Sequence, residues 1–510
     1  MKRIAALLLA LLMIASSLTL FSCATPQEDE KKDDGTSEGN QGTTAGDDEE
    51  EGEPRLPLDL PEATYNGKEI HFLSWSANGQ REVGNGWIPW EEVDVPDYDG
   101  DPINGAVYDR NGAVEERFDV VITSEYVDVD GAVLTTAIRN NHTSGDDTYQ
   151  IITTRSYEMK SIVLENLMYN MFELENLHTD MPWWNQDSVA SFTFGSALFF
   201  AAPEMLLRDK GATATMYYND KVATDYGVPD LYAMVEDGTW TFEEFVSISE
   251  SVATSLDGDD VMNSGNDLWG ANTSDDSVYF LFAGSGMKFA HMNEDGYIEY
   301  DFGSEESILF MQDIFDLTIY SDHCAHDKVV DLSDAPTGGI FKSDNALFNF
   351  GLVKSILDLR DMESDFGVLP IPKYDEYQEN YYSLVYIHHD CVLGMPAVVQ
   401  EAEAVSVVLE YMSYLSYYDI YPIFYDTVIL GKSPRDEKSK DMLELIFQTR
   451  MFDPGQYWDH GADMTGIHGD QGYLRMAGTG NNNVASVYAR FEKAIEFSFN
   501  QINEYIEKLS

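Results

Sequence analysis

Basic residues are scarce in this chain of 510 residues. It has 30 lysines and arginines against 91 aspartates and glutamates, a formal net charge of −61. Nucleic-acid binding depends on many basic contacts to phosphates, so this composition excludes nucleic acid as a partner. The charge also disfavours an anionic substrate, which the field of the protein would repel, and favours a neutral or cationic one. With 44% hydrophobic residues, the chain still has enough apolar material for two or three folded domains.

Cysteine is nearly absent as well, with three residues in the whole chain. Cys324 and Cys391 are predicted to be free thiols, although an oxidising compartment would allow them to pair. The folded part lacks a Gly-x-Ser-x-Gly elbow, a phosphate-binding loop and a His-Glu-x-x-His helix. We therefore expect a protein that is not an enzyme and has no cofactor. Paired carboxylates are frequent in so acidic a chain, so a glycan hydrolase remains the alternative.

Only one apolar run is long enough to reach into a membrane. It extends from Ile4 to Phe21, after the positive Lys2 and Arg3, and has the pattern of a secretory signal. The run ends in "LFSC", which resembles the lipobox of bacterial lipoproteins. The resemblance implies that residues 1–22 are removed and that Cys23 carries lipid, which anchors the protein outside the cytoplasmic membrane.

Residues 23–57 are dominated by Gly, Ser, Thr, Asp and Glu, as in "GTSEGNQGTTAGDDEEEGEP". Such a segment has too little apolar surface to form a core. We interpret it as a disordered acidic tether between the lipid and the folded part.

The folded part opens with strands that alternate with helices. Strands are predicted at Lys68–Trp75, Asp119–Thr123 and Tyr149–Thr154, with helices at Ile103–Phe118 and Gly131–Asn141. This alternation predicts parallel pairing in a doubly wound sheet.

In such sheets ligands bind beyond the carboxyl ends of the strands. The predicted ligand contacts at those ends are Trp75, Ser76, Arg155 and Ser156. Because Trp75 is placed at the ligand, its removal is expected to cost affinity and little stability.

The stretch "GTWTFEEF" places a tryptophan just before a helix start. Thr241 and Glu244 have the spacing of a capping box, and Trp240 and Phe245 have that of a hydrophobic staple. Trp240 is therefore predicted to be structural. Apolar stripes predict two further core-facing helices, at Ala404–Ser416 and Arg490–Leu509.

Several segments together resemble the extracellular solute-binding proteins of family 1, the group that includes maltose-binding protein. The segments are "MYYNDKVATDYGVPDLYAMVEDGTWTFEEF", "DFGVLPIPKYDE", "VLGMPAVVQEAEAVSVVLEYMS" and "GKSPRDEKSKDMLELIFQTRMFDPG". The resemblance implies an α/β fold of the two-lobed, type II periplasmic-binding-protein kind, with a doubly wound sheet in each lobe, a hinge and an inter-lobe cleft. The implied lobes are residues 58–205 with 370–425, and residues 206–369 with 426–510.

The resemblance also implies the function. It is that of a substrate-binding component of an ABC importer, which closes on a neutral solute, most often a sugar, and delivers it to a membrane permease. A sensor that presents its ligand to a signalling receptor is a further alternative. In this family the turn at "YIHHDC" faces the cleft, which makes His388 and His389 candidate ligand contacts.

Other candidates depend on local pattern alone. Trp183 and Trp184 are adjacent, so in extended chain one would face the core and the other the ligand. Trp87 and Trp90 lie in a loop and either line the cleft rim or cover the fold. Neither "SDHCAHD" (His323, Cys324, His326 and Asp327) nor the acidic loop from Asp257 to Asp267 has convincing metal-ligand spacing, so no metal site is predicted.

Overall fold

The computed structural model describes residues 54–76, 90–98, 100–128, 133–256, 258, 260–327, 329–336, 339–430, 437–459 and 483–509. The chain divides into two compact units, residues 1–55 and 56–510, of which the second holds nearly all of the described residues. The predicted signal sequence, Cys23 and nearly all of the tether lie outside the described residues, as does Trp87.

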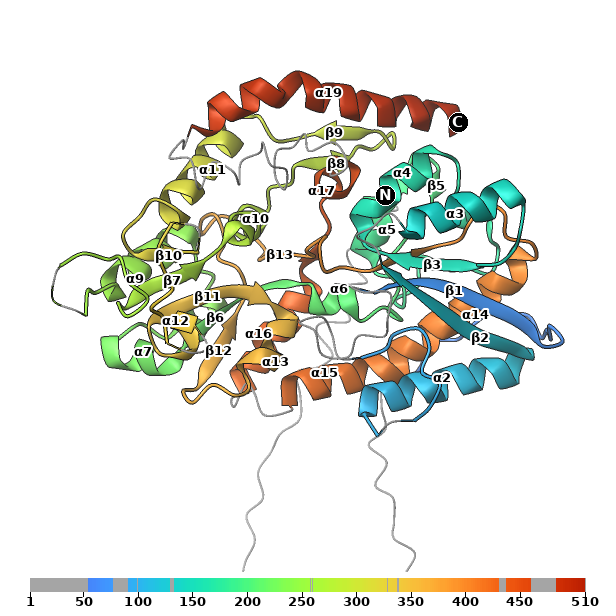
Figure 1. The fold of residues 1–510 in the computed structure, drawn as a ribbon, viewed down its shortest axis with the longest axis horizontal. Coiled ribbons are helices and arrows are strands. Elements are labelled where there is room, and N and C mark those ends of the chain that lie inside the picture. The colour runs from blue at the N-terminus through green and yellow to red at the C-terminus, as the bar shows by residue number, and fades with distance from the viewer. Residues whose placement is uncertain are drawn as a thin grey trace, which may run out of the picture. The chain divides into compact units, whose positions relative to one another are not determined.

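The first sheet has the strand order β14-β3-β1-β2 (Figure 1). Its strands are β1 (Lys68–Ser76), β2 (Val120–Asp128), β3 (Ile151–Thr154) and β14 (Val392–Gly394). β1 pairs in parallel with both β2 and β3, and β14 joins the edge of β3 in the antiparallel sense. Helices α2 (Pro102–Phe118), α3 (Val133–Ser144) and α14 (Ala402–Leu415) belong to this half. The predicted parallel pairing of the first three strands is confirmed.

The second sheet has the order β10-β7-β11-β6-β12. Its strands are β6 (Ala214–Asn219), β7 (Trp269–Thr273), β10 (Cys324–His326), β11 (Ala346–Leu352) and β12 (Phe366–Leu369). β7 pairs in parallel with β10 and β11, whereas β6 is antiparallel to β11 and β12. Helices α9 (Phe242–Val252), α10 (Asp275–Gly284) and α11 (Glu305–Thr318) belong to this half.

Shorter elements connect the two sheets and cover them. The α-helices are α4 (Met159–Leu164), α5 (Gln186–Phe192), α6 (Arg208–Gly211), α7 (Asp220–Tyr226), α8 (Leu231–Glu236), α12 (Gly339–Lys342), α13 (Ile356–Leu359), α15 (Tyr421–Leu430), α16 (Glu437–Gln448) and α17 (Pro454–Asp459). Three short 3-10 helices are η1 (Ser156–Glu158), η2 (Met171–Glu173) and η3 (Val353–Ser355), and η4 (Ser416–Ile420) is a π-helix. The short strands are β4 (Thr193–Phe194), β5 (Ala197–Leu198), β8 (Ala290–Met292), β9 (Ile298–Tyr300), β13 (Ser383–Leu384) and β15 (Arg450–Met451).

Three runs of chain lie side by side where the two sheets are joined. Thr213 bridges to Val385, Ala201 bridges to Leu393, and β13 pairs in parallel with β15. The chain therefore crosses between two sheet-centred halves several times. The predicted α/β, two-lobed type II binding-protein fold is confirmed.

A buried charge network ties these crossing runs together. Arg450 contacts Asp209 at 2.7 Å and Glu204 at 3.3 Å, and Lys210 contacts Glu204 at 2.9 Å and Asp209 at 3.5 Å. All four side chains are at most 8% exposed. Breaking one member would leave its partners buried without their counter-charge, so the network stabilises the packing of the crossing segments.

The last helix, α19 (Val484–Leu509), spans parts of both halves (Figure 1). Val484 and Val487 at its start pack in the core of the second sheet, whereas Phe499 and Ile502 pack in the core of the first. The apolar stripe predicted for this helix is confirmed as a core face. The same holds for α14, whose predicted apolar residues are all buried.

Trp240 has the structural role predicted for it. Thr241 caps α9 by accepting a hydrogen bond from the Glu244 backbone N–H at 3.4 Å. The Trp240 ring is fully buried, with its centre 6.2 Å from that of Phe245. Its indole N–H donates to the Pro370 carbonyl at 3.0 Å. Trp240 thus fixes both the entry into α9 and the segment that returns towards the first sheet.

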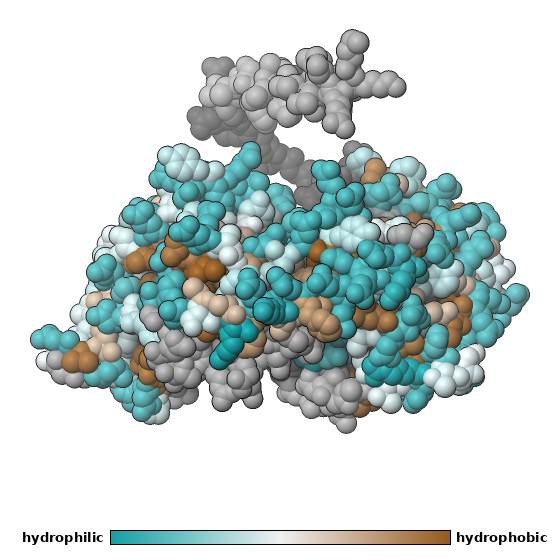
Figure 2. All heavy atoms as spheres, turned by 90° about the horizontal axis from the view of Figure 1, so that it is seen from above, coloured by the Kyte–Doolittle hydropathy of each residue, from teal (hydrophilic) through white to brown (hydrophobic). Residues whose placement is uncertain are grey.

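Hydrophilic residues dominate the face in Figure 2, and hydrophobic ones form small separate groups. Among the described helices, none is both long and apolar enough to span a bilayer.

Candidate functional site

The carboxyl ends of β1 and β3 bring two predicted contacts together. These strands are parallel and in register, so Trp75 near the end of β1 lies beside Arg155, which follows β3. The guanidinium carbon of Arg155 lies 5.5 Å from the centre of the Trp75 ring and 4.6 Å from that of Tyr157. These are distances of cation–π contact.

Residues that follow the carboxyl ends of two strands in the second sheet also lie in this region. Lys354 follows the carboxyl end of β11, and Asp276 follows that of β7. The Lys354 ammonium lies 2.9 Å from Nδ1 of His389, and the Tyr386 hydroxyl donates a short hydrogen bond to Asp276. Side chains from both sheets therefore meet at the turn that contains Tyr386 and His389.

The first sheet also reaches this turn. The His388 ring lies between two aromatic rings, 5.4 Å from Tyr157 and 5.2 Å from Tyr386. The Ser156 backbone N–H donates to the Asp390 carboxylate at 3.0 Å. Trp75, Arg155, Ser156, His388 and His389 are thus brought into one region, which we call the junction site. Ser76 ends β1 beside them, opposite Asp128 in the register with β2.

Burial and charge shift the pKa values of this region strongly. Burial, followed by the fields of Lys354, His388 and Arg155, lowers the pKa of His389 to about 3, so this imidazole is neutral. Burial lowers the pKa of Lys354 to about 8, partly offset by the charge of Asp358. Burial raises the pKa of Asp390 to about 8, although the hydrogen bond from Ser156 acts to lower it. This carboxyl is therefore largely protonated at neutral pH.

Trp75 is more enclosed than its position at a strand end predicts. Its ring is 1% exposed, and the Arg208 guanidinium lies 4.5 Å from the ring centre. Arg208 also donates to the Trp75 carbonyl at 3.1 Å and pairs with Glu92 at 3.3 Å. The expectation that removing Trp75 costs little stability is therefore wrong, because the ring fills part of a packed core.

Trp183 and Trp184 lie elsewhere, in the core of the first half. Both rings are fully buried. Their indole N–H groups donate to the two oxygens of Glu410, at 2.7 and 2.8 Å. The expectation that they face opposite ways does not hold, because the chain turns at these residues instead of running extended. Their role as ligand contacts stays a prediction. Their indole hydrogen bonds go to Glu410 and not to a residue of the junction site.

Four residues that contact the junction site were not predicted from the sequence: Tyr157, Arg208, Lys354 and Tyr386. Tyr157 follows directly on the predicted Arg155 and Ser156, so a strand-end rule applied one residue further would have found it. Lys354 follows β11 in the same way, but that strand was not predicted. Arg208 and Tyr386 lie on crossing segments, whose proximity is set by long-range pairing alone.

The metal alternatives receive no support from the described residues. No group of three or more His, Cys, Asp or Glu side chains there is arranged to hold a metal ion. Asp267 turns inward, where it accepts hydrogen bonds from the backbone N–H groups of Leu256, Asn263 and Ser264 at 3.1 Å each. Cys324 and Cys391 are buried free thiols, as predicted.

The loop tryptophan Trp90 covers the fold. It is 3% exposed and packs edge-on against Phe424, with ring centres 5.3 Å apart. Of the two alternatives for this residue, the structural one is confirmed.

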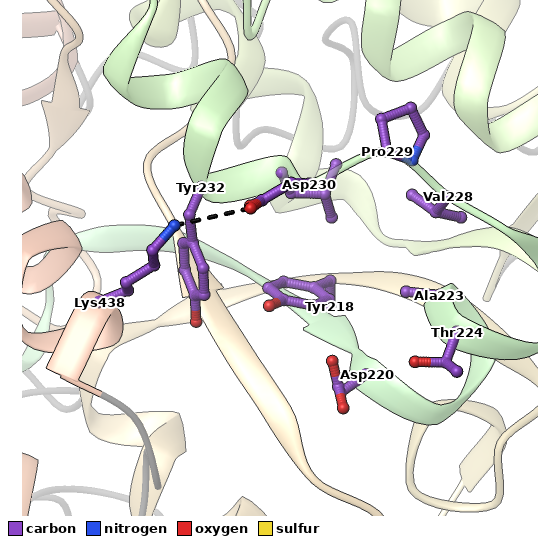
Figure 3. Close-up of a pocket in the computed structure, with 10 residues that line it drawn as sticks. Tyr218, Asp220, Ala223, Thr224, Val228, Pro229, Asp230, Tyr232 and Lys438 are labelled. Atoms are coloured by element: carbon purple, nitrogen blue, oxygen red, sulfur yellow. Dashed lines mark ion pairs between the residues drawn. The ribbon is translucent and has the colours of Figure 1, made fainter.

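A separate hollow of about 350 Å³ lies beside α7 and α8 of the second half (Figure 3). Tyr218 and Tyr232 line it, and Lys438 pairs with Asp230 across it at 3.6 Å. The Tyr232 hydroxyl is already bonded to Ser439 at 2.6 Å. None of the crossing segments lines this hollow, so the junction site is the better candidate for a ligand that both halves hold.

Comparison with known proteins places the fold. No family model and no curated protein matches the chain. Solved structures do match. UspC of M. tuberculosis has a TM-score of 0.55 at 14% identity, over 84% of this chain and all of that one. The maltose-binding protein MalE of Listeria monocytogenes, in complex with maltose, has 0.54 at 12% identity, over 86% and 99%.

A third match is the ABC substrate-binding protein Lmo0181 of Listeria monocytogenes, in complex with cycloalternan. It has a TM-score of 0.52 at 12% identity, over 86% of this chain and 99% of that one. At such identities the likeness is one of fold. This chain has the two-lobed fold of extracellular substrate-binding proteins.

Proposed function

We propose that this protein is the substrate-binding component of an ABC importer and that it binds a carbohydrate at the junction site. One observation carries the proposal: residues at the carboxyl ends of strands from two sheets converge on the turn at Tyr386–Asp390, where the chain crosses between halves. Closure about the crossing segments would enclose a ligand held by both halves. The fold neighbours solved with maltose and cycloalternan support a carbohydrate as ligand.

The proposal includes an N-terminal lipid on Cys23 and a tether that places the folded part at the outer face of the cytoplasmic membrane, where a permease receives the ligand. Trp75, Ser76, Arg155, Ser156, His388 and His389 are the proposed ligand contacts. We propose no catalytic residue.

The alternatives are a surface-anchored glycan hydrolase and a sensor for a signalling receptor. The test is to incubate the purified mature protein with a panel of oligosaccharides, measuring heat of binding and, by chromatography, products. Stoichiometric binding without products supports the binding protein, and turnover identifies a hydrolase. A failure to bind any oligosaccharide would overturn the proposal. Co-purification with permease subunits, or with a receptor, separates importer from sensor.

A further inference from the structure

A further hollow, of about 440 Å³, lies on the first half at the end of helix α3. We call it the α3 hollow; its polar and aromatic lining residues are Asn140, Asn141, Ser144, Asp146, Thr148 and Tyr149. The lining comes from one stretch of chain, residues 137–149, which ends just before β3. Because β1, β2 and β3 are parallel, the α3 hollow lies near the amino ends of these strands, at the opposite edge of the sheet from the junction site.

One hydrogen-bond donor in the α3 hollow is unsatisfied. The Asn141 side chain is 5% exposed, and its Oδ1 accepts a hydrogen bond from the Thr148 backbone N–H at 3.3 Å, which fixes the orientation of the amide. Its Nδ2 group is buried and has no hydrogen-bond partner among the described residues. Buried polar groups are almost always paired, because leaving one unpaired costs free energy. An acceptor atom of a bound ligand would supply the missing partner.

Tyr149 supplies an aromatic ring to the same hollow. Its hydroxyl donates to Glu125 at 2.8 Å, and its ring centre lies 5.1 Å from that of His71. These contacts hold the partly exposed ring in place without a ligand. The apolar C–H face of a sugar ring can stack on such a preorganised aromatic surface.

The remaining lining groups suit the hydroxyls of a neutral sugar. Asn140, Ser144 and Thr148 are exposed and offer amide and hydroxyl groups. Asp146 is also exposed, and the described part of the chain gives its carboxylate no ion-pair partner, so it can accept hydrogen bonds from sugar hydroxyls. No lysine or arginine is among the described lining residues, which disfavours an anionic ligand.

We propose that the α3 hollow is a second carbohydrate site, which holds a neutral sugar residue of a glycan polymer. The inference goes beyond the proposed function and does not depend on it, since the sugar chemistry is argued from the lining residues of this hollow alone. All of these residues lie in one half, so binding here does not require closure about the crossing segments. A protein held on a polymer meets the fragments released from it at a raised effective concentration.

The experiment is affinity electrophoresis of the mature protein in native gels that contain amylopectin, xylan or laminarin, which are neutral glycans. We expect at least one of them to retard the protein. Asp146→Ala changes an exposed side chain, so it should fold normally, and it should weaken retardation by about tenfold or more because hydrogen bonds to a charged group are lost. Tyr149→Ala should weaken it similarly, whereas Tyr149→Phe, which keeps the ring, should retain most of it.

Asp109→Ala is the matched control, because Asp109 is exposed on α2 of the same half and does not line the hollow. It should leave retardation unchanged. If no glycan retards the unmodified protein, or Asp146→Ala is retarded as strongly as Asp109→Ala, the inference is overturned. Calorimetric titration of Asp146→Ala with free oligosaccharides tests the junction site separately, so binding there would leave the proposed function standing when the second site fails.

Discussion

Trp183 and Trp184, adjacent in the sequence, share one buried carboxylate. Each indole N–H donates to a different oxygen of Glu410, and the His178 backbone N–H donates to the same group at 3.2 Å. Burial raises the pKa of Glu410, and the two indole hydrogen bonds oppose that rise. The carboxylate thus anchors a turn of the first half to helix α14 by hydrogen bonds.

Glu410→Gln tests this anchor. An amide offers one oxygen and one NH₂ group, so one indole N–H would face a donor and lose its acceptor. An unsatisfied buried donor costs about 1–3 kcal/mol, and we expect a loss of that size in the free energy of unfolding, measured by urea denaturation. Glu403→Gln is the control, because Glu403 is exposed on the same helix. Equal stability of both variants would contradict the role of Glu410.

Local pattern was enough to predict much of the fold. The staple at Trp240, the first strands and the apolar faces of α14 and α19 follow from spacing alone, because each depends on neighbours within a few residues. The grouping of Trp183 with Glu410, or of Lys354 with His389, depends on contacts between residues far apart in the chain. Such contacts leave no periodic signal in one sequence, which is why Arg208, Lys354 and Tyr386 were not predicted to lie at the junction site.

Trp240→Ala should act on stability and not on ligand affinity. The buried ring packs on Phe245 and Phe348, with ring centres 6.2 and 5.5 Å away. Removing it should cost about 3–5 kcal/mol of unfolding free energy. Trp240→Phe keeps an aromatic ring but loses the hydrogen bond to Pro370, so it should cost less. Calorimetric titration of the folded protein should give unchanged affinity; abolished binding at full stability would contradict the assignment.

Asp390→Asn should flatten the dependence of stability on pH. The pKa of Asp390 is about 8 in the folded protein and ordinarily 3.8, so between these values the folded state retains a proton that the unfolded chain has released. Stability due to this group therefore falls as pH rises from about 4 to 8, by up to about 1.4 kcal/mol per pH unit.

The asparagine keeps an oxygen for the Ser156 N–H and does not ionise. Urea denaturation at pH 5 and pH 8 should show a smaller loss for Asp390→Asn than for the unmodified protein. Asp453, whose pKa burial raises to about 6, adds a similar trend to both proteins, so the difference between them isolates Asp390. Parallel pH profiles would show that Asp390 does not titrate in this range.

Cys23→Ala should release the protein from the membrane or leave it unprocessed. Without a thiol at this position no lipid can be attached, so a processed chain would lack the anchor that the lipid provides. Fractionation and mass measurement of the mature N-terminus distinguish these results. A variant that is correctly processed and still membrane-bound would disprove the lipid on Cys23.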